Sequence, residues 1–307
     1  MFILTKSTSN QFLAIVKLVR PRQWIKNAFV FIPFFFGDKL TDFKLVIAGI
    51  IVFIAFCFAS GSIYILNDLS DIEFDRRHPE KKGRPLAAKK ISINTAVLVM
   101  ILFASLAVIM GFWHSNQVGI VIVSFIMLNI FYSVYFKNIV LLDIFCIAIG
   151  FLLRIIGGIY ACTVPPSKWI IVMALAIALF LAVGKRRADL LTADESIKNH
   201  RIVLKSYCMR TIDQMIVILA AMIIITYSLY ATSDYVTGRY GTDAMIYTIP
   251  FVIYGLFRYL YVVNDKGSTG DPTKILLSDS HLFLCVFAWL VLCGTIIYGH
   301  FKLILWQ

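Results

Sequence analysis

Charged side chains are scarce in this chain. Asp, Glu, Lys and Arg make up 15% of its 307 residues, against about 25% in soluble domains. Hydrophobic residues make up 60% and the mean hydropathy is +0.85. A water-soluble fold of this length could not bury that much apolar surface. The composition therefore excludes a cytosolic enzyme, a nucleic-acid-binding module and a disordered protein, and it fits a chain that crosses a membrane many times.

Acidic residues are scarcer than basic ones, with 17 Asp and Glu against 29 Lys and Arg, for a net charge of +12. In a soluble protein this excess would indicate a nucleic-acid partner. In a membrane protein it reflects cytoplasmic loops that face anionic lipid. We therefore expect a membrane partner and no nucleic acid.

Paired cysteines and a signal peptide are also lacking. No two of the six cysteines form a CxxC pair, and most lie within apolar runs. We expect neither a disulfide framework nor a zinc site. The N-terminal stretch lacks the charged, apolar and small-residue order of a signal peptide, so we expect no cleavage there.

Long apolar runs are what the chain has instead. They predict an all-α, polytopic membrane protein with nine transmembrane helices, because about 20 apolar residues cross a bilayer. The runs cover residues 24–37, 45–66, 92–113, 117–136, 139–160, 168–184, 212–232, 244–263 and 281–301.

The loops between these runs alternate in Lys and Arg content. If the N-terminus is cytoplasmic, 23 of the 29 Lys and Arg residues fall on the inner side and 5 on the outer side. Because positive residues concentrate on cytoplasmic loops, we predict a multi-pass protein of the cell membrane with a cytoplasmic N-terminus. The two largest polar segments, 67–91 and 185–211, are then both cytoplasmic. Their starts are 118 residues apart, which favours two four-span units plus one further span.

An acidic cluster follows the second run directly. Asp68, Asp71 and Asp75 are spaced i, i+3 and i+7, so on a helix they lie within about 60° of one another. Such carboxylates repel one another unless a cation lies among them, and oxygen ligands suit Mg²⁺. Asn67 adds a neutral oxygen. We predict that all four bind Mg²⁺ and that the three Asp are catalytic; the alternative is a solvated acidic helix end.

Basic and hydroxyl-bearing residues recur on the predicted cytoplasmic side. We expect them to bind substrate, because a metal-bound diphosphate also needs cationic partners. The alternative for each is a topology anchor or an aromatic-belt residue. The candidates are Arg22, Lys26, Arg84, Tyr132, Lys137, Lys185, Arg186, Arg187 and Arg258.

Two charges fall inside the fifth run. Asp143 and Arg154 are 11 residues apart, which is about three turns and ~16 Å along a helix. They are too far apart to pair within that helix. We expect both to face the bundle interior or a polar cavity, because intramembrane charges avoid lipid.

The pattern Asn67-Asp68-x-x-Asp71-x-x-x-Asp75 after the second of nine spans resembles the UbiA superfamily of intramembrane prenyl-group enzymes. The resemblance covers essentially the whole chain. It implies one membrane domain over residues 1–307, built as a helical bundle with a central cavity open to the cytoplasmic side.

Further motifs resemble one branch of that superfamily. Aromatic prenyltransferases usually carry a second motif, with Asp residues four apart, after span six. Here Asp189 and Asp194 are five apart and follow Lys185-Arg186-Arg187. That run resembles the decaprenyl-phosphate phosphoribosyltransferase branch. So do the stretch 20–27, Arg258-Tyr259, Asp271-Pro272 and Asp279.

This resemblance implies an Mg²⁺-dependent phosphoribosyltransferase. Its substrates would be 5-phosphoribosyl diphosphate and a polyprenyl phosphate, and its product would serve cell-envelope polysaccharide synthesis. The donor carries a diphosphate and a separate 5-phosphate, and the lipid carries a further phosphate, which agrees with a second segment rich in Lys and Arg. A phosphate nucleophile is already ionised at neutral pH, so no strong general base is expected.

Two other functions stay open at this point. One is a UbiA-type prenyltransferase that joins a polyprenyl diphosphate to an aromatic or quinone precursor. The other is a membrane transporter, which would not explain clustered Asp beside a set of cations. The sequence also leaves a homo-oligomer open.

Overall fold

The structure is a computed structural model, and it describes residues 11, 13–77, 81–165, 167–192, 202–264 and 272–299. Within these ranges the secondary structure is helical and contains no strand. The elements are η1 (Pro21–Phe31), α2 (Ile32–Phe36), α3 (Phe43–Ser70), α4 (Ile72–Arg77), α5 (Ile93–His114), α6 (Asn116–Val134), η2 (Phe136–Asn138), α7 (Leu142–Cys162), α8 (Lys168–Thr192), α10 (Ile202–Lys205), α11 (Met209–Ala231), α12 (Asp234–Tyr240), η3 (Ala244–Thr248), α13 (Ile249–Asn264), α14 (Pro272–Ser278) and α15 (Ser280–Tyr298).

Eight of the nine predicted spans correspond to helices that are long and apolar enough to cross a membrane, among the residues that the structure describes. The first predicted span does not form one such helix. Its residues are divided between the 3₁₀ helix η1 and the five-residue α2. Just before η1, Arg20 adopts a left-handed conformation with φ 53° and Pro21 follows. A left-handed residue ends an α-helix, so the helical residues 13–19 do not continue into η1. The all-α, multi-pass architecture is confirmed.

The chain divides into two compact units, which we describe one at a time. Unit 1 comprises residues 1–136 and 153–164, and unit 2 comprises residues 137–152 and 165–307. The helix α7 contributes its first half to unit 2 and its second half to unit 1.

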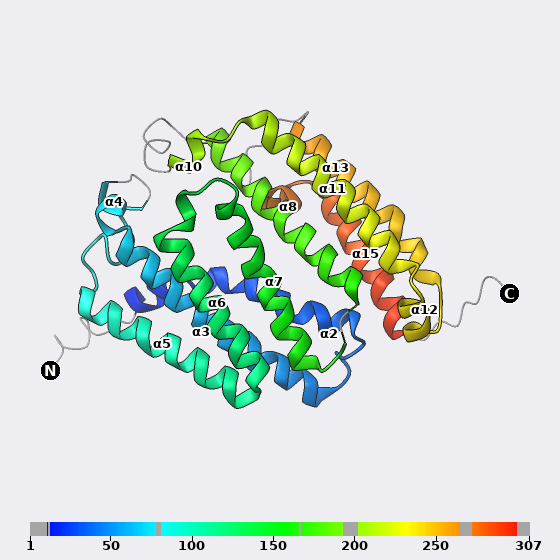
Figure 1. Cartoon of the computed structure of the whole chain (residues 1–307), viewed down its shortest axis with the longest axis horizontal. Helices are drawn as coiled ribbons and strands as arrows, with labels where there is room; N and C mark the ends of the chain where they lie inside the picture. The colour runs from blue at the N-terminus through cyan, green and yellow to red at the C-terminus, as the bar shows by residue number, and fades with distance from the viewer. Residues whose placement is uncertain are drawn as a thin grey trace. The chain divides into compact units, whose positions relative to one another are not determined.

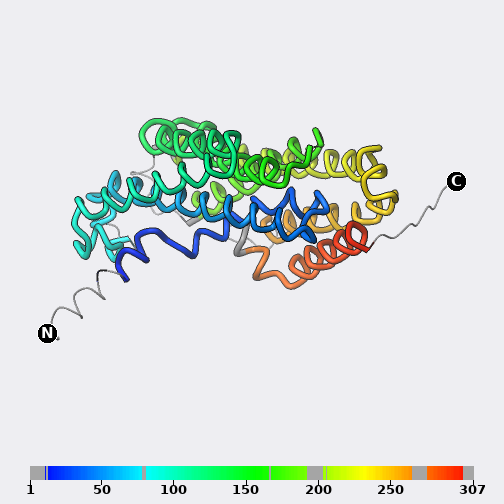
Figure 2. The backbone as a smooth tube through the Cα atoms, turned by 90° about the horizontal axis from the view of Figure 1, so that it is seen from below, coloured from blue at the N-terminus to red at the C-terminus, as the bar shows by residue number. Residues whose placement is uncertain are grey.

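In unit 1, α5 and α6 form an antiparallel hairpin that packs on α3, and η1 runs along α3 (Figures 1 and 2). The core is aromatic and β-branched, with Phe34, Phe56 and Val52 fully buried. Gly158 of α7 lies so close to the backbone of Val30 that a Cβ there would collide with its carbonyl. This close approach requires glycine.

In unit 2, α8 packs along α11, and α13 packs on α15 (Figure 1). The core includes Ile144, Ile212 and Ile216, with the Phe180 and Tyr259 rings 4.9 Å apart between centroids. The helix α8 continues to Thr192, beyond the predicted end at residue 184, so the run Lys185-Arg186-Arg187 is helical.

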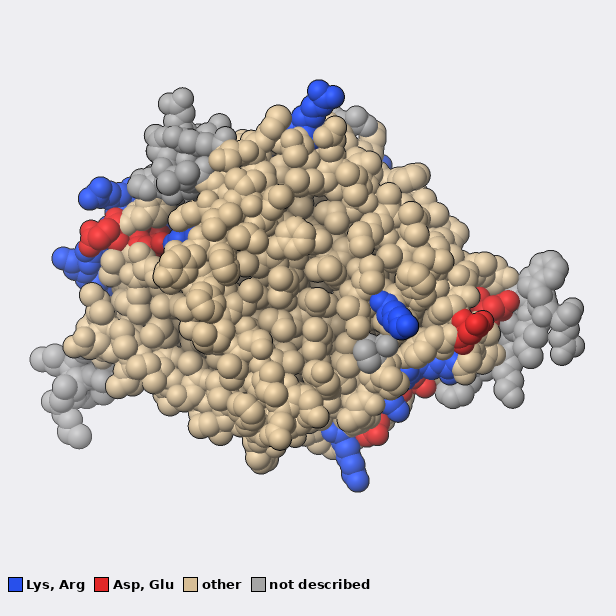
Figure 3. All heavy atoms as spheres, viewed as in Figure 1, with Lys and Arg blue, Asp and Glu red and all other residues tan. Residues whose placement is uncertain are grey.

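Charge is distributed unevenly over unit 1. In the space-filling view, blue and red atoms gather around α4, whereas the surface over α5 and α6 is free of them (Figure 3). The same two helices carry exposed isoleucines, Ile101 and Ile109 in α5 and Ile120 in α6. Such a contiguous apolar face suits contact with lipid.

Candidate functional site

The acidic segment forms the join between α3 and α4. Asp68 lies in the last turn of α3, Asp71 is its C-cap, and Asp75 lies in α4. Two backbone hydrogen bonds span the join, from Asp71 N to the Asn67 carbonyl at 3.0 Å and from Asp75 N to the Asp71 carbonyl at 2.8 Å. The helical repeat is thus nearly preserved, as the spacing predicts. Asp68 and Asp75 are buried and Asp71 is half-buried.

Two arginines neutralise the buried carboxylates. The Nη1 of Arg84 lies 3.0 Å from Asp68 Oδ1 and 2.6 Å from Asp75 Oδ2, so a single nitrogen bridges both side chains. Arg20 pairs with the same Oδ1 of Asp68. Arg84 reaches this position from a turn that is anchored by Leu86, which is 2% exposed and packs in one core cluster with Ile65 of α3.

Two carboxylate oxygens in this cluster have no hydrogen-bond partner among the described residues. They are Oδ2 of Asp68 and Oδ1 of Asp75, and both are buried. A buried carboxylate oxygen without a partner is costly, and oxygen donors are what Mg²⁺ prefers. The residues present therefore fit a divalent cation. No group of three His, Cys, Asp or Glu lies close enough to share a metal within the described ranges, so the predicted role of Asp71 stays a prediction.

The side chain of Asn67 is held in place by a hydrogen bond from the helix α6. Its Oδ1 accepts a hydrogen bond of 2.5 Å from Ser133 Oγ, near the end of α6. The same hydroxyl lies 2.7 Å from the Asn129 carbonyl, so its one hydrogen is shared between the two acceptors. The side chain of Asn67 is thus oriented by α6, and the neighbouring Tyr132 is half-buried.

The other predicted residues of unit 1 lie on η1. Arg22 is exposed and Lys26 is half-buried. Between them, Trp24 donates its indole N–H to the Val19 carbonyl at 3.1 Å, which joins η1 to the preceding helical residues 13–19. The binding of substrate by Arg22 and Lys26 stays a prediction.

In unit 2 the three consecutive cations of α8 have different environments. Lys185 is exposed. Arg186 is 5% exposed and its Nη2 lies 2.5 Å from Oδ2 of Asp143, which is fully buried. Arg187 Nε pairs with Asp213 Oδ1 at 2.7 Å. Phosphate binding was predicted for all three, but the structure places carboxylates against both arginines.

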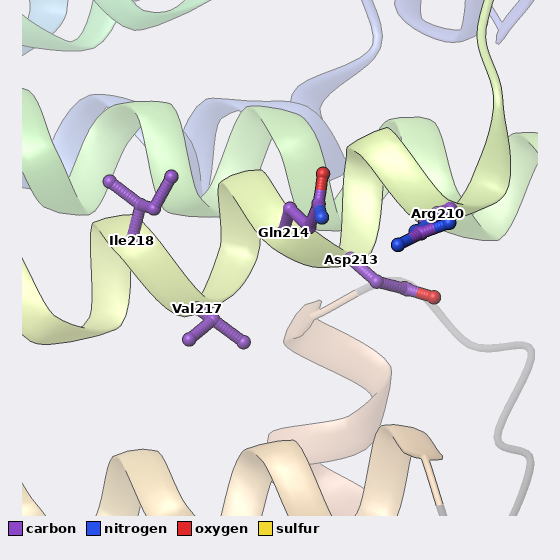
Figure 4. Close-up of a pocket in the computed structure, with 5 residues that line it drawn as sticks. All are labelled: Arg210, Asp213, Gln214, Val217 and Ile218. Carbon is purple, nitrogen blue, oxygen red and sulfur yellow. The ribbon is translucent and has the colours of Figure 1, made fainter.

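Asp213 lies on the side of α11 that lines an open hollow of about 850 Å³. Figure 4 shows that all five lining residues come from successive turns of this one helix, with the polar side chains at its first turns. They are Arg210, Asp213, Gln214, Val217 and Ile218.

The half-buried Lys137, another predicted substrate-binding residue, belongs to η2 of the same unit.

Tyr207 completes the Asp143 cluster. Its hydroxyl donates to Asp143 Oδ1 at 2.6 Å and accepts from the Leu141 N–H at 2.8 Å. Burial, followed by the hydrogen bond to Asp143, raises the pKa of Tyr207 well above its usual value of 10. Tyr207 therefore stays protonated and acts as a permanent donor to the carboxylate.

We expect this raised pKa to make the protein less stable in alkali. A group whose pKa is raised on folding contributes stability that is full below its unfolded pKa of about 10 and is lost as the pH rises beyond it. Above pH 10 the slope contributed by Tyr207 is about 1.4 kcal/mol per pH unit. Thermal unfolding of wild type and Tyr207→Phe between pH 8 and pH 11 checks this. Parallel curves for the two proteins would contradict the assignment.

Arg258, another predicted phosphate ligand, forms a bidentate ion pair with Asp279. The distances are 3.0 Å from Nε to Oδ1 and 2.8 Å from Nη2 to Oδ2. Asp279 also caps α15 through the Leu282 N–H at 2.9 Å. Arg258 thus joins α13 to the start of α15, and its predicted role with phosphate stays untested.

The intramembrane charges do not pair with each other, as expected from their spacing. Asp143 binds Arg186, whereas Arg154 donates to Asn27 Oδ1 at 2.7 Å and to Ser60 Oγ at 3.3 Å. Asn27 and Ser60 are buried. Arg154 therefore joins η1 to α3 within unit 1.

We expect Asn27→Leu to destabilise the protein, because it removes the amide oxygen nearest to a buried guanidinium. A hydrogen bond to a charged group contributes about 1.5–3 kcal/mol. Arg154→Met should cost less, since Ser60 and Asn27 then retain their mutual hydrogen bond of 3.2 Å and no charge is left behind. Thermal unfolding of both variants measures the difference, and equal losses would contradict it.

Arg20 and Ser133 were not among the predicted site residues, although Arg20 belongs to the stretch 20–27 that supports the resemblance to the phosphoribosyltransferase branch. Arg20 could have been noticed because it is the residue before Pro21, where a helix is expected to break. Ser133 is the neighbour of the predicted Tyr132, but a serine in an apolar helix carries no signal of its own.

Comparison with known proteins gives a consistent result. The model of the UbiA prenyltransferase family matches residues 30–285. The decaprenyl-phosphate phosphoribosyltransferase of Mycolicibacterium smegmatis is 33% identical, over 92% of each chain. The enzyme of the same name from Corynebacterium glutamicum is 31% identical, over 89% of this chain and 83% of its own. The predicted family, branch and transferase class are thereby confirmed.

The fold has solved neighbours. A UbiA homolog from Archaeoglobus fulgidus, solved with GPP and Mg²⁺ bound, matches with a TM-score of 0.69 at 17% identity, over 93% of this chain and 99% of that one. The alignment spans nearly the whole of both chains, and the helices superpose although few residues are shared. The family model, the relatives and the fold agree: the chain is a multi-pass membrane protein that belongs to the UbiA prenyltransferase family.

Proposed function

We propose that the protein transfers 5-phosphoribose from 5-phosphoribosyl diphosphate to a polyprenyl phosphate and releases pyrophosphate. The main observation is the pair of buried carboxylates, Asp68 and Asp75, whose partnerless oxygens lie beside two arginines. Such a mixed site suits a diphosphate with its cation. The relatives named for this activity support the choice of donor and acceptor.

The bond changes need little proton transfer. The lipid phosphate oxygen forms a bond to ribose C1 while the bond from C1 to the diphosphate oxygen breaks. By analogy with glycoside chemistry, C1 passes through an oxocarbenium-like state. The attacking phosphate is already ionised, so the protein's task is to position the two anionic substrates and to stabilise the leaving group.

We propose the following roles for the residues of unit 1. Asn67, Asp68, Asp71 and Asp75 hold Mg²⁺, which when bound offsets charge on the leaving pyrophosphate. Ser133 orients the amide of Asn67. The cations and hydroxyls at this end, which bind the donor's phosphates, are Arg22, Lys26, Arg84 and Tyr132.

In unit 2 we propose Lys185 and Lys137 as phosphate-binding cations. Lys185 is exposed and has no carboxylate partner among the described residues. Three other predicted ligands are each paired with an Asp, namely Arg186, Arg187 and Arg258. Each of them would bind phosphate only by leaving that Asp. We propose further that the protein lies in the cell membrane with its N-terminus on the cytoplasmic side, because the Lys and Arg residues of the loops then concentrate on that side.

The test uses the full-length protein purified in detergent. It is incubated with Mg²⁺, polyprenyl phosphate and radiolabelled 5-phosphoribosyl diphosphate, and the lipid phase is counted. We expect label in the lipid that disappears with EDTA. A parallel reaction contains a polyprenyl diphosphate and 4-hydroxybenzoate. Label-free lipid together with a prenylated aromatic product would overturn the proposal in favour of prenyl transfer.

A further inference from the structure

We propose that Arg20 and Arg84 are exchangeable counter-ions, which hold Asp68 and Asp75 in the empty protein and move to the donor's diphosphate when a divalent cation takes over the carboxylates. Metal and diphosphate then bind as a mutually dependent pair. The inference rests on the proposed function, because it assumes a donor that carries a diphosphate.

The contacts place an arginine where a cation would bind. Arg84 Nη1 lies between the two carboxylates, 3.0 Å from Asp68 and 2.6 Å from Asp75. The second oxygen of each carboxylate is buried without a partner. A cation held by Asp68 and Asp75 would therefore compete with this nitrogen for the carboxylates, and it would offer a partner to oxygens that the guanidinium leaves without one.

Burial decides which groups can move. The side chains of Asp68 and Asp75 are 2% exposed, whereas those of Arg20 and Arg84 are 27% and 28% exposed. Two buried carboxylates at a helix join are fixed by the packing around them. The arginines reach in from the surface on long side chains, so they can leave the carboxylates without unfolding the site.

Arg20 is placed for this exchange by its backbone. It separates the helical residues 13–19 from η1 in a left-handed conformation, with φ 53°. The Arg20 guanidinium forms an ion pair with Asp68 and lies 5.3 Å from the ring centroid of Tyr64. The aromatic face stabilises the guanidinium in the position that it occupies in the empty protein.

Charge balance makes the two ligands depend on each other. In the empty protein the two buried carboxylates, Asp68 and Asp75, are offset by the two guanidinium groups of Arg20 and Arg84. A divalent cation alone adds two positive charges to a largely buried site, and a diphosphate alone adds negative charge beside two carboxylates. Both are unfavourable at low dielectric. When both bind together, each ligand offsets much of the charge that the other brings, with the arginines on the phosphates and the cation on the carboxylates.

The experiment measures binding without turnover, on the full-length protein. Calorimetry gives the affinity for Mn²⁺ alone, and retention of labelled pyrophosphate in the presence of Mn²⁺ gives the affinity for the anion. Arg20→Gln and Arg84→Gln are each expected to bind Mn²⁺ alone at least threefold more tightly than wild type. Each is expected to bind pyrophosphate with Mn²⁺ at least tenfold more weakly. A purely structural role would weaken both.

Arg76→Gln is the matched control. Arg76 lies in α4 and pairs with exposed Glu73, not with the buried carboxylates; its variant should match wild type in both assays. Weaker Mn²⁺ binding by both Arg20→Gln and Arg84→Gln, or unchanged pyrophosphate binding, would overturn the exchange.

Wild type provides a test that does not depend on any variant. Mn²⁺ alone should leave its melting temperature unchanged at concentrations where Mn²⁺ with pyrophosphate raise it. An equal rise with Mn²⁺ alone would overturn the mutual dependence. Because pyrophosphate is common to phosphoribosyl and prenyl donors, these results stand apart from the transfer assay, and either proposal can fail while the other holds.

Discussion

Asp75→Asn is expected to lower kcat for phosphoribosyl transfer by about 10³-fold. The substitution keeps the size of the side chain but removes the negative charge of a buried group that faces Arg84 at 2.6 Å. A bound metal contributes several kcal/mol to stabilising a leaving group, and about 4 kcal/mol corresponds to about 10³-fold in rate. Initial rates with saturating lipid and donor measure the loss.

Glu73→Gln is the matched control for this prediction. Glu73 lies in the same short helix, two residues from Asp75, and undergoes the same loss of charge. Its side chain is 70% exposed and pairs only with Arg76 among the described residues. An exposed pair contributes little, so the rate should stay within about twofold.

Binding of Mn²⁺ separates a lost ligand from a damaged fold. Asp75→Asn should keep a cooperative thermal transition but lose affinity for Mn²⁺ in the presence of pyrophosphate. If the variant kept wild-type turnover, or turned over slowly while binding Mn²⁺ as wild type does, Asp75 would not be a metal ligand.

Arg186→Gln and Lys185→Gln are expected to have opposite consequences although the residues are adjacent. Arg186 is buried against Asp143, and breaking a buried ion pair from one side costs about 3–5 kcal/mol. Lys185 is exposed, so its loss should leave stability unchanged. It should instead raise KM for a phosphate-bearing substrate about tenfold, because a charge-assisted hydrogen bond contributes about 1.5–3 kcal/mol.

A double-mutant cycle isolates the ion pair. Asp143→Asn alone should destabilise the protein as Arg186→Gln does, whereas the two together should cost less than the sum, because no unpaired charge is left buried. Thermal unfolding in one detergent gives all four values. Additive losses would show that Arg186 and Asp143 are not coupled, and a rise in KM with unchanged stability for Arg186→Gln would return Arg186 to the phosphate-binding residues.

Much of the architecture could be predicted from the sequence, since apolar runs of about 20 residues have one stable form in a bilayer. The exception is the first run, residues 24–37, which forms the 3₁₀ helix η1 and the short α2 after a break in helicity at Arg20 and Pro21. Hydropathy does not detect a break of this kind, because it depends on one backbone conformation. The acidic segment was also readable, because carboxylates that extend an apolar span need a partner.

The amino-acid sequence by itself determined the membrane-spanning class, the helical content and the residue types that gather at Asn67 to Asp75. Each follows from composition or from spacing along one helix, which are local properties. Only the tertiary structure decided which cation pairs with which carboxylate. Arg84 and Arg20 form ion pairs with Asp68, and Arg186 forms an ion pair with Asp143. Such pairs join residues 16 to 48 positions apart, and their partners are selected by packing and burial, which no local pattern encodes.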